Sequence, residues 1–110
     1  MYAGELLNML PVKRVIGEVP AHVTEIVIDS RAVQQDSMFI CIKGYTVDGH
    51  DYAEQAIEAG ATIIVTEREL TLPEGVTQVV VRDTTRALGL LAAKFYDYPS
   101  QDMFMIGVTG

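Results

Sequence analysis

Short apolar runs that end in small or polar residues alternate along this chain with stretches of helical periodicity. Residues 23–28 alternate in polarity, with Ile26 and Ile28 on one face, which is typical of a half-buried strand. Residues 38–42 are apolar on both faces, as in a strand that is covered on both sides. Further runs predict strands at 62–65, 78–81 and 103–106, and a weaker edge strand at 15–19.

The segment after the second of these strands has the features of a helix over residues 51–59. Asp51 followed by Glu54 has the spacing of a capping box, which begins a helix. Gly60 suits the left-handed position that follows the last turn. The sequence therefore predicts a strand–helix–strand unit in this region.

A longer helix is expected to begin at Asp83 or Thr84, and a short one is expected over residues 5–10. The longer helix has apolar residues at the i, i+3, i+4 and i+7 positions of one face, namely Leu88, Leu91, Ala92 and Phe95. Alternating strands and helices predict an α/β fold, with a mostly parallel or mixed sheet of about five strands and helices on its faces.

Two of the predicted strands stop at segments that could bind a ligand. The strand at 23–28 runs into Asp29-Ser30-Arg31, and the strand at 38–42 is followed by a loop from Gly44 to Gly49. Ligands of open α/β sheets bind beyond the carboxyl ends of the strands. If these two strands are parallel neighbours, both segments lie on one rim, and this rim is the candidate site.

Each segment also has a purely structural interpretation. The Ser30 hydroxyl could exchange hydrogen bonds with a ligand, or Asp29 and Ser30 could build a local turn while Arg31 pairs with an acidic neighbour. The glycine-bracketed loop could bring backbone N–H groups to an anion, or it could be an ordinary strand-to-helix connection. It lacks the G-x-G-x-x-G pattern, so the sequence does not support dinucleotide binding.

Other reactive residue types give little support for catalysis or metal binding. Cys41 is the only cysteine, and it is expected to be a packed core thiol because no activating base lies near it in sequence. His50 is expected to order the loop through hydrogen bonds rather than to act as a base. His22 is isolated, so no metal-binding spacing exists.

The charge balance limits the classes of partner. Eight basic and 15 acidic residues give a formal net charge of −7. Affinity for nucleic acid or anionic lipid depends on clustered Lys and Arg, so neither partner is expected. No apolar run approaches the roughly 20 residues that a membrane helix needs. With no signal peptide evident, a cytoplasmic location is expected.

The end of the sequence has a pattern of its own. The apolar run at 103–106 leads into Gly107-Val108-Thr109-Gly110, which is how a phosphate-binding loop begins, without its Gly-Lys-Thr part. This pattern suggests that a nucleotide-binding domain follows in a longer protein. The alternative is a small protein that is complete as it stands.

Taken together, an ordered series of short motifs resembles the N-terminal domain of the UDP-N-acetylmuramoyl-tripeptide synthetases, the MurE branch of the Mur ligase family. The motifs are Asp29-Ser30-Arg31, Met38-Phe39, Lys43-Gly44, Asp48-Gly49-His50-Asp51, Gly60-Ala61, Phe95-Tyr96, Pro99-Ser100 and Ile106-Gly107-Val108-Thr109-Gly110. The resemblance covers nearly the whole chain from about Glu25 onward.

The resemblance implies a cytoplasmic, ATP-dependent ligase of peptidoglycan synthesis. Such a ligase adds meso-diaminopimelate or L-lysine to UDP-N-acetylmuramoyl-L-alanyl-D-glutamate through an acyl-phosphate. Residues 1–110 would form a single domain that binds the UDP part of this substrate. The central domain, which holds ATP and magnesium, and the C-terminal domain would be absent, so residues 1–110 should be inactive alone and hold no cofactor. Gly110 would be the first glycine of the ATP phosphate loop.

The resemblance also implies which residues contact the substrate. The serine of the family's Asp-Ser-Arg motif, here Ser30, contacts the UDP-sugar, and Ile28 two residues before it is a further neighbour. Contacts also come from the tripeptide after the strand-end glycine, here Tyr45, Thr46 and Val47. Asp36 stands where many members have glycine, and aspartate tolerates a left-handed turn.

Two alternatives remain at this stage. The N-terminal domain of MurF, the next ligase of the pathway, has a similar pattern, although the Gly-Tyr-Thr-Val-Asp-Gly-His-Asp-Tyr run favours MurE. A free-standing, non-enzymatic α/β binding module is the alternative from another class.

Overall fold

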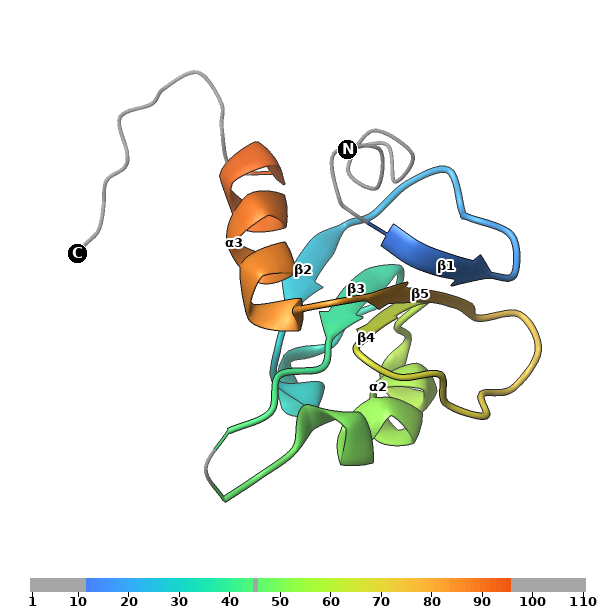
Figure 1. The fold of residues 1–110 in the computed structure, drawn as a ribbon. Helices are drawn as coiled ribbons and strands as arrows, with labels where there is room; N and C mark the ends of the chain where they lie inside the picture. Colours follow the sequence, from blue (N-terminus) through green and yellow to red (C-terminus); the bar gives the residue numbers. More distant parts are fainter. Residues whose placement is uncertain (1–11, 45, 96–110) are drawn as a thin grey trace.

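The computed structural model describes residues 12–44 and 46–95, and it shows a five-stranded mixed sheet with helices on both faces (Figure 1). The strands are β1 (Val12–Ile16), β2 (Glu25–Val27), β3 (Ser37–Ile40), β4 (Ile63–Thr66) and β5 (Thr77–Val81). The helical elements are the 3₁₀ turns η1 (Ser30–Ala32) and η2 (Gly49–Tyr52), and the helices α2 (Ala53–Ala59) and α3 (Thr84–Phe95). The predicted α/β class with a mostly parallel or mixed sheet is confirmed.

The strand order is β1-β5-β4-β3-β2. Strands β2 to β5 are parallel to their neighbours, and β1 pairs antiparallel with β5 at one edge. The predicted edge strand therefore exists, but it lies at Val12–Ile16 rather than at 15–19, since Gly17 leaves the strand with a φ of 97°. The parallel strands place their carboxyl ends along one edge of the sheet.

Each face of the sheet carries its own core cluster. Met38 and Ile40 point to the face covered by α3, where they join Ala87 and Leu91. Phe39 points to the other face, where it joins residues of α2. The prediction that this strand is covered on both sides is confirmed, since all four residues of β3 are buried.

Several predicted boundaries are wrong in an informative way. The strand predicted over residues 23–28 is shorter than expected, since β2 spans Glu25–Val27 and Ile28 lies beyond its end, 50% exposed. The capping box from Asp51 to Glu54 does not form, because η2 comes first and α2 begins at Ala53 with no side-chain cap. The expected helix over 5–10 and strand over 103–106 lie outside the described residues.

Other local predictions are confirmed. Gly60 has a φ of 124° at the end of α2, and Asp36 takes a φ of 65° in the turn before β3. Asp83 begins α3, since its Oδ1 accepts a hydrogen bond from the Arg86 N–H at 3.1 Å. Leu91 is fully buried on the predicted face. In the part of the chain that the structure describes, no helix is both long and apolar enough to cross a membrane.

Candidate functional site

The two predicted ligand segments lie together at the carboxyl edge of the sheet. β2 and β3 are parallel neighbours, with Ile26 opposite Met38 and Val27 opposite Phe39. The segments that follow them border a cavity of about 540 Å³, within the range of small-molecule sites. The lining residues are Ile28, Asp29, Ser30, Arg31, Phe39, Ile42, Gly44, Val47, Gly49, Tyr52 and Gln55. We call this space the rim cavity.

Ser30 contributes a buried polar group to the rim cavity. It is the first residue of η1, and Asp29 caps this turn by accepting a hydrogen bond from the Arg31 N–H at 2.9 Å. Ser30 is only 8% exposed, and its hydroxyl makes no hydrogen bond to any residue in the described ranges. A hydroxyl in this position can both donate to and accept from a bound molecule.

Arg31 fulfils the structural interpretation of its motif. Its Nε and Nη2 donate to the two carboxylate oxygens of Asp29 at 3.1 and 2.9 Å. This hydrogen bonding lowers the pKa of Asp29 and raises the pKa of Arg31. An electrostatic interaction with Tyr52 further raises the pKa of Arg31. The pair is exposed, so it adds little to stability. Its main effect on the rim cavity is that the two charges cancel.

The Gly44–Gly49 loop is held by two backbone hydrogen bonds, one within the loop and one to Ile42, which precedes it. Gly44 N–H donates to the Val47 carbonyl at 2.7 Å, and Gly49 N–H donates to the Ile42 carbonyl at 2.8 Å. A Cβ on Gly49 would lie 2.6 Å from the Ile42 nitrogen, so only glycine fits there. This close backbone approach positions the loop beside the cavity.

The predicted contact residues are brought together only in part. Ile28 and Val47 line the rim cavity with side chains about half exposed, at 50% and 49%. Thr46 is exposed and is not among the lining residues. Tyr45 lies outside the described residues, as does Gly110.

His50 orders the loop, as predicted, and also ties it to the next strand. The buried imidazole contacts the Asp48 carboxylate through Nδ1 at 2.7 Å, and its Nε2 accepts the Glu67 N–H at 2.9 Å. Since Nε2 accepts, the hydrogen-bond pattern assigns the proton to Nδ1. The His50 N–H, the imidazole and Arg68 lower the pKa of Asp48 to about 2 against the opposing effect of burial.

Glu67 extends this connection to α3. One of its carboxylate oxygens accepts from both the backbone N–H and the hydroxyl of Thr84, at 2.9 and 3.1 Å. Thr84 is fully buried at the first turn of α3. The segments after β3 and β4 and the start of α3 are therefore joined by one chain of hydrogen bonds, which we call the edge network.

Cys41 has the structural role that the sequence indicated. It is fully buried in the cluster beneath α2, and this burial raises the pKa of its thiol to about 12. A thiol with such a pKa is neither a nucleophile nor a ready metal ligand at neutral pH. Within residues 12–44 and 46–95, no group of three or more His, Cys, Asp or Glu side chains is placed to hold a metal ion.

Sequence reasoning missed four lining residues: Phe39 and Ile42, which were predicted only as strand residues, and Tyr52 and Gln55. Tyr52 ends η2 and is 40% exposed, and Gln55 follows it on α2. Residues three apart on helical backbone share a face, so their spacing was available in the sequence. The sequence did not predict the η2 turn, which directs the face that carries Tyr52 and Gln55 toward the Asp29-Ser30-Arg31 segment.

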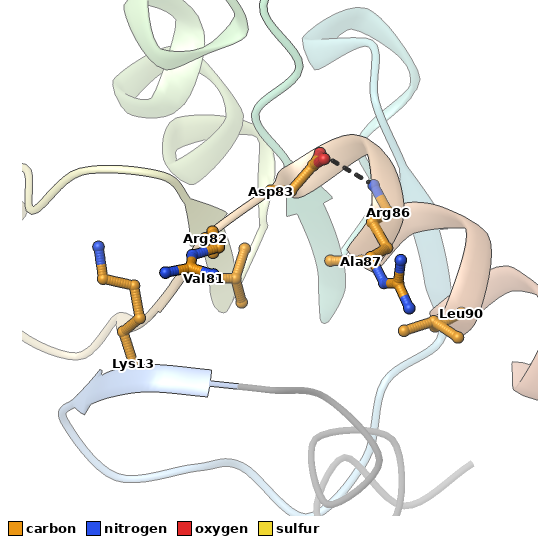
Figure 2. A pocket seen from close by; sticks show the side chains of 7 residues that line it. All are labelled: Lys13, Val81, Arg82, Asp83, Arg86, Ala87 and Leu90. Carbon is orange, nitrogen blue, oxygen red and sulfur yellow. Dashed lines mark hydrogen bonds between the residues drawn. The ribbon is translucent and has the colours of Figure 1, made fainter.

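A second cavity, of about 470 Å³, lies on the α3 side of the sheet (Figure 2). Val81, Ala87 and Leu90 give it an apolar floor, and three basic side chains stand around it, those of Lys13, Arg82 and Arg86. The Asp83 side chain beside them accepts the Arg86 N–H and so belongs to the helix cap. None of the sequence-predicted site residues lines this cavity.

Comparison with known proteins gives consistent matches. A family profile described as "Mur ligase family, catalytic domain" matches residues 22–96. The chain is 46% identical to UDP-N-acetylmuramyl-tripeptide synthetase 2 of Oceanobacillus iheyensis over its full length, which is 23% of that protein. It is 50% identical over 96% of its length to a UDP-N-acetylmuramoyl-L-alanyl-D-glutamate–2,6-diaminopimelate ligase of Halalkalibacterium halodurans, covering 21% of that protein.

An L-lysine ligase of Staphylococcus haemolyticus is also similar, with 44% identity over the whole chain and 22% of that protein. Among solved structures, MurF from Acinetobacter baumannii matches with a TM-score of 0.73 and 28% identity, over 84% of this chain and 20% of that one. The chain thus spans about a fifth of the length of the relatives it matches. From its matched residues and these relatives, the chain belongs to the Mur ligase family.

Proposed function

We propose that this chain is the substrate-binding part of a MurE-type ligase and that the rim cavity holds the UDP end of UDP-N-acetylmuramoyl-L-alanyl-D-glutamate. The whole enzyme would join meso-diaminopimelate or L-lysine to this substrate with ATP. Identities of 44–50% to ligases of this type, against 28% to MurF, support the MurE assignment.

The names of the relatives support the proposal that this chain binds the UDP-N-acetylmuramoyl-L-alanyl-D-glutamate substrate rather than the amino acid that is added. Ligases for 2,6-diaminopimelate and for L-lysine match this chain at similar identity, 47% and 44%. Their names differ in the amino acid and agree in the UDP-N-acetylmuramoyl-L-alanyl-D-glutamate part. A segment that is equally similar to both is suited to binding what both enzymes share.

Ser30 is the observation that carries the proposal. Its hydroxyl lies in the wall of the rim cavity and makes no hydrogen bond to another described residue, so it is available to donate to and accept from a bound molecule. A polar group of the substrate would exchange a hydrogen bond with this hydroxyl. Ile28 and Val47 offer apolar contact beside it, and we propose Tyr45 and Thr46 as further contacts from the same loop.

The mechanistic contribution of such a domain is positional. Anchoring the nucleotide end of a long substrate fixes where its far carboxylate lies, so binding energy far from the reaction is used for orientation. The described residues offer no cluster of carboxylates for magnesium. We propose that ATP and magnesium bind to the remaining domains of the full-length ligase, which would be the partners of this part, with Gly110 at the start of the phosphate loop.

The test is a titration of the chain with UDP-N-acetylmuramoyl-L-alanyl-D-glutamate, followed by amide chemical shifts and calorimetry. Shifts should concentrate at Ser30 and at the loop after β3. Ser30→Ala should weaken binding about three- to tenfold, as expected for one hydrogen bond. It should change the free energy of unfolding by less than about 0.5 kcal/mol, since no bond within the protein is lost.

Thr85→Ala is the matched control, because it also removes one hydroxyl but at an exposed position of α3. It should leave the affinity unchanged. Shifts confined to α3, or equal binding by the Ser30→Ala and parent proteins, would contradict the proposal.

A further inference from the structure

Exposed apolar side chains concentrate at the rim cavity. Five large hydrophobic residues of the described ranges are notably exposed, at Val15, Val19, Ile28, Val47 and Tyr52. Three of them, Ile28, Val47 and Tyr52, line this one cavity. They come from three different segments, so no single helix or strand face explains the grouping. A cavity with apolar side chains on several sides is suited to binding a flat, weakly hydrated ring such as a nucleobase.

The charges around the rim cavity point to the same part of a ligand. Its charged lining residues are Asp29 and Arg31, and each is already satisfied by the other at 2.9 Å. A diphosphate needs unpaired cations or several converging N–H donors. The lining therefore suits a neutral base better than a charged phosphate.

Tyr52 and Gln55 are the two lining residues best equipped to recognise a base. Neither side chain forms a hydrogen bond to another described residue, and their separation of three positions puts them on one face of the η2–α2 segment. An aromatic ring can stack on any base. A glutamine amide carries one acceptor and two donors, which complement the C=O and N–H groups along the imide edge of uracil.

We infer that Tyr52 stacks on the uracil ring of the nucleotide and that the Gln55 amide pairs with its imide edge. This inference rests on the proposed function and names the residues that determine base specificity. Within the UDP end, the base would then be the part that lies inside the rim cavity, and the diphosphate would extend beyond it. Ser30 is left free to bond the ribose or the outer carbonyl of the base.

The test measures the affinity of the chain for UMP and for N3-methyl-UMP, in which the imide N–H is replaced by a methyl group. Tyr52→Ala should weaken UMP binding at least about fivefold, whereas Tyr52→Phe should stay within about twofold because the ring remains. The parent protein should bind N3-methyl-UMP at least about fivefold more weakly than UMP.

Gln55→Ala should bring the ratio of the two affinities close to one, because the discriminating group is gone. Glu58→Ala, on the same helix but outside the lining, should leave both affinities unchanged. If the parent binds the UDP-substrate but tolerates the N3 methyl group, or if Tyr52→Ala binds normally, the inference is wrong and the proposed function stands. If the parent binds neither UMP nor the UDP-substrate, both are wrong.

Discussion

Gly49 offers the sharpest test of how the candidate site is built. A Cβ at this position would lie 2.6 Å from the Ile42 nitrogen, 3.0 Å from the Ile42 oxygen and 3.1 Å from the Cys41 Cα. All three are backbone atoms of the two residues that follow β3, so no side-chain rotation relieves the contact. Gly49→Ala must therefore separate the loop from the strand end.

The size of the effect follows from three contributions. Overpacking of a well-packed site costs about 1–3 kcal/mol. Separating the segments also weakens the hydrogen bond from Gly49 N–H to the Ile42 carbonyl, now 2.8 Å long, which contributes about 1 kcal/mol. Replacing glycine restricts the unfolded chain and returns roughly 0.4–1 kcal/mol. We expect Gly49→Ala to lower the free energy of unfolding by about 2 kcal/mol.

Gly89→Ala provides the matched control, since it is the same chemical change in open space. Gly89 lies within α3, and nothing is within 4 Å of its Cβ position. Alanine favours a helix interior over glycine by about 1 kcal/mol, so this variant should be more stable than the parent. Urea unfolding followed by circular dichroism measures both. The reasoning fails if Gly49→Ala lies within about 0.5 kcal/mol of the parent, or if both variants shift in the same direction.

Three further predictions concern the titratable groups around the sheet edge. Cys41, with a buried thiol of pKa about 12, should not react with a disulfide reagent at pH 8 until urea unfolds the chain; rapid native reaction would contradict its packing. Asp48, whose pKa is lowered from 3.8 to about 2, should stabilise the fold by roughly 2 kcal/mol at neutral pH. A carboxyl group whose pKa is lower in the folded than in the unfolded state stabilises the fold at pH values above its unfolded-state pKa. The difference in unfolding free energy between the parent and Asp48→Asn should therefore shrink as the pH falls from about 4 to 2. A difference that does not change with pH would contradict the lowered pKa. Glu67→Ala leaves the buried Thr84 N–H and hydroxyl without their acceptor and should cost about 1–3 kcal/mol in urea unfolding. Glu67→Gln keeps an acceptor oxygen and should cost less; equal losses would count against the capping role.

The sequence predicted the sheet well because its central strands are buried on both faces. A strand such as β3 must be apolar at every position, and this pattern needs no knowledge of its neighbours. The convergence of two strand ends was also predictable, since it follows from parallel pairing of β2 with β3. The predicted structural roles of Cys41 and His50 are also correct. The sequence places no activating base near Cys41 and no second metal ligand near His50, so neither residue was predicted to be reactive.

The errors arise where local capping overrides periodicity. The alternation of residues 23–28 predicts a strand that continues to Ile28, yet the chain leaves the sheet after Val27 to enter η1, which Asp29 caps. Likewise, Asp51 has capping-box spacing, but Asp48 accepts the His50 N–H first and begins η2 instead. Two aspartates three residues apart compete for the same role. Asp48 caps the helical segment because His50, which it contacts, is also bound by the Glu67 backbone, and this tertiary contact cannot be read from the periodicity of the sequence.

That tertiary contact explains why the rim can be preorganised without strong charges. His50 is held by Asp48 on one side and by the Glu67 backbone on the other, at 2.7 and 2.9 Å. Glu67 is in turn fixed by the buried Thr84. The loop beside the rim cavity therefore depends on α3, on the opposite face of the sheet (Figure 1). Because these bonds already hold the loop in the free protein, little conformational entropy is lost when a ligand binds, and a largely neutral cavity can still bind selectively.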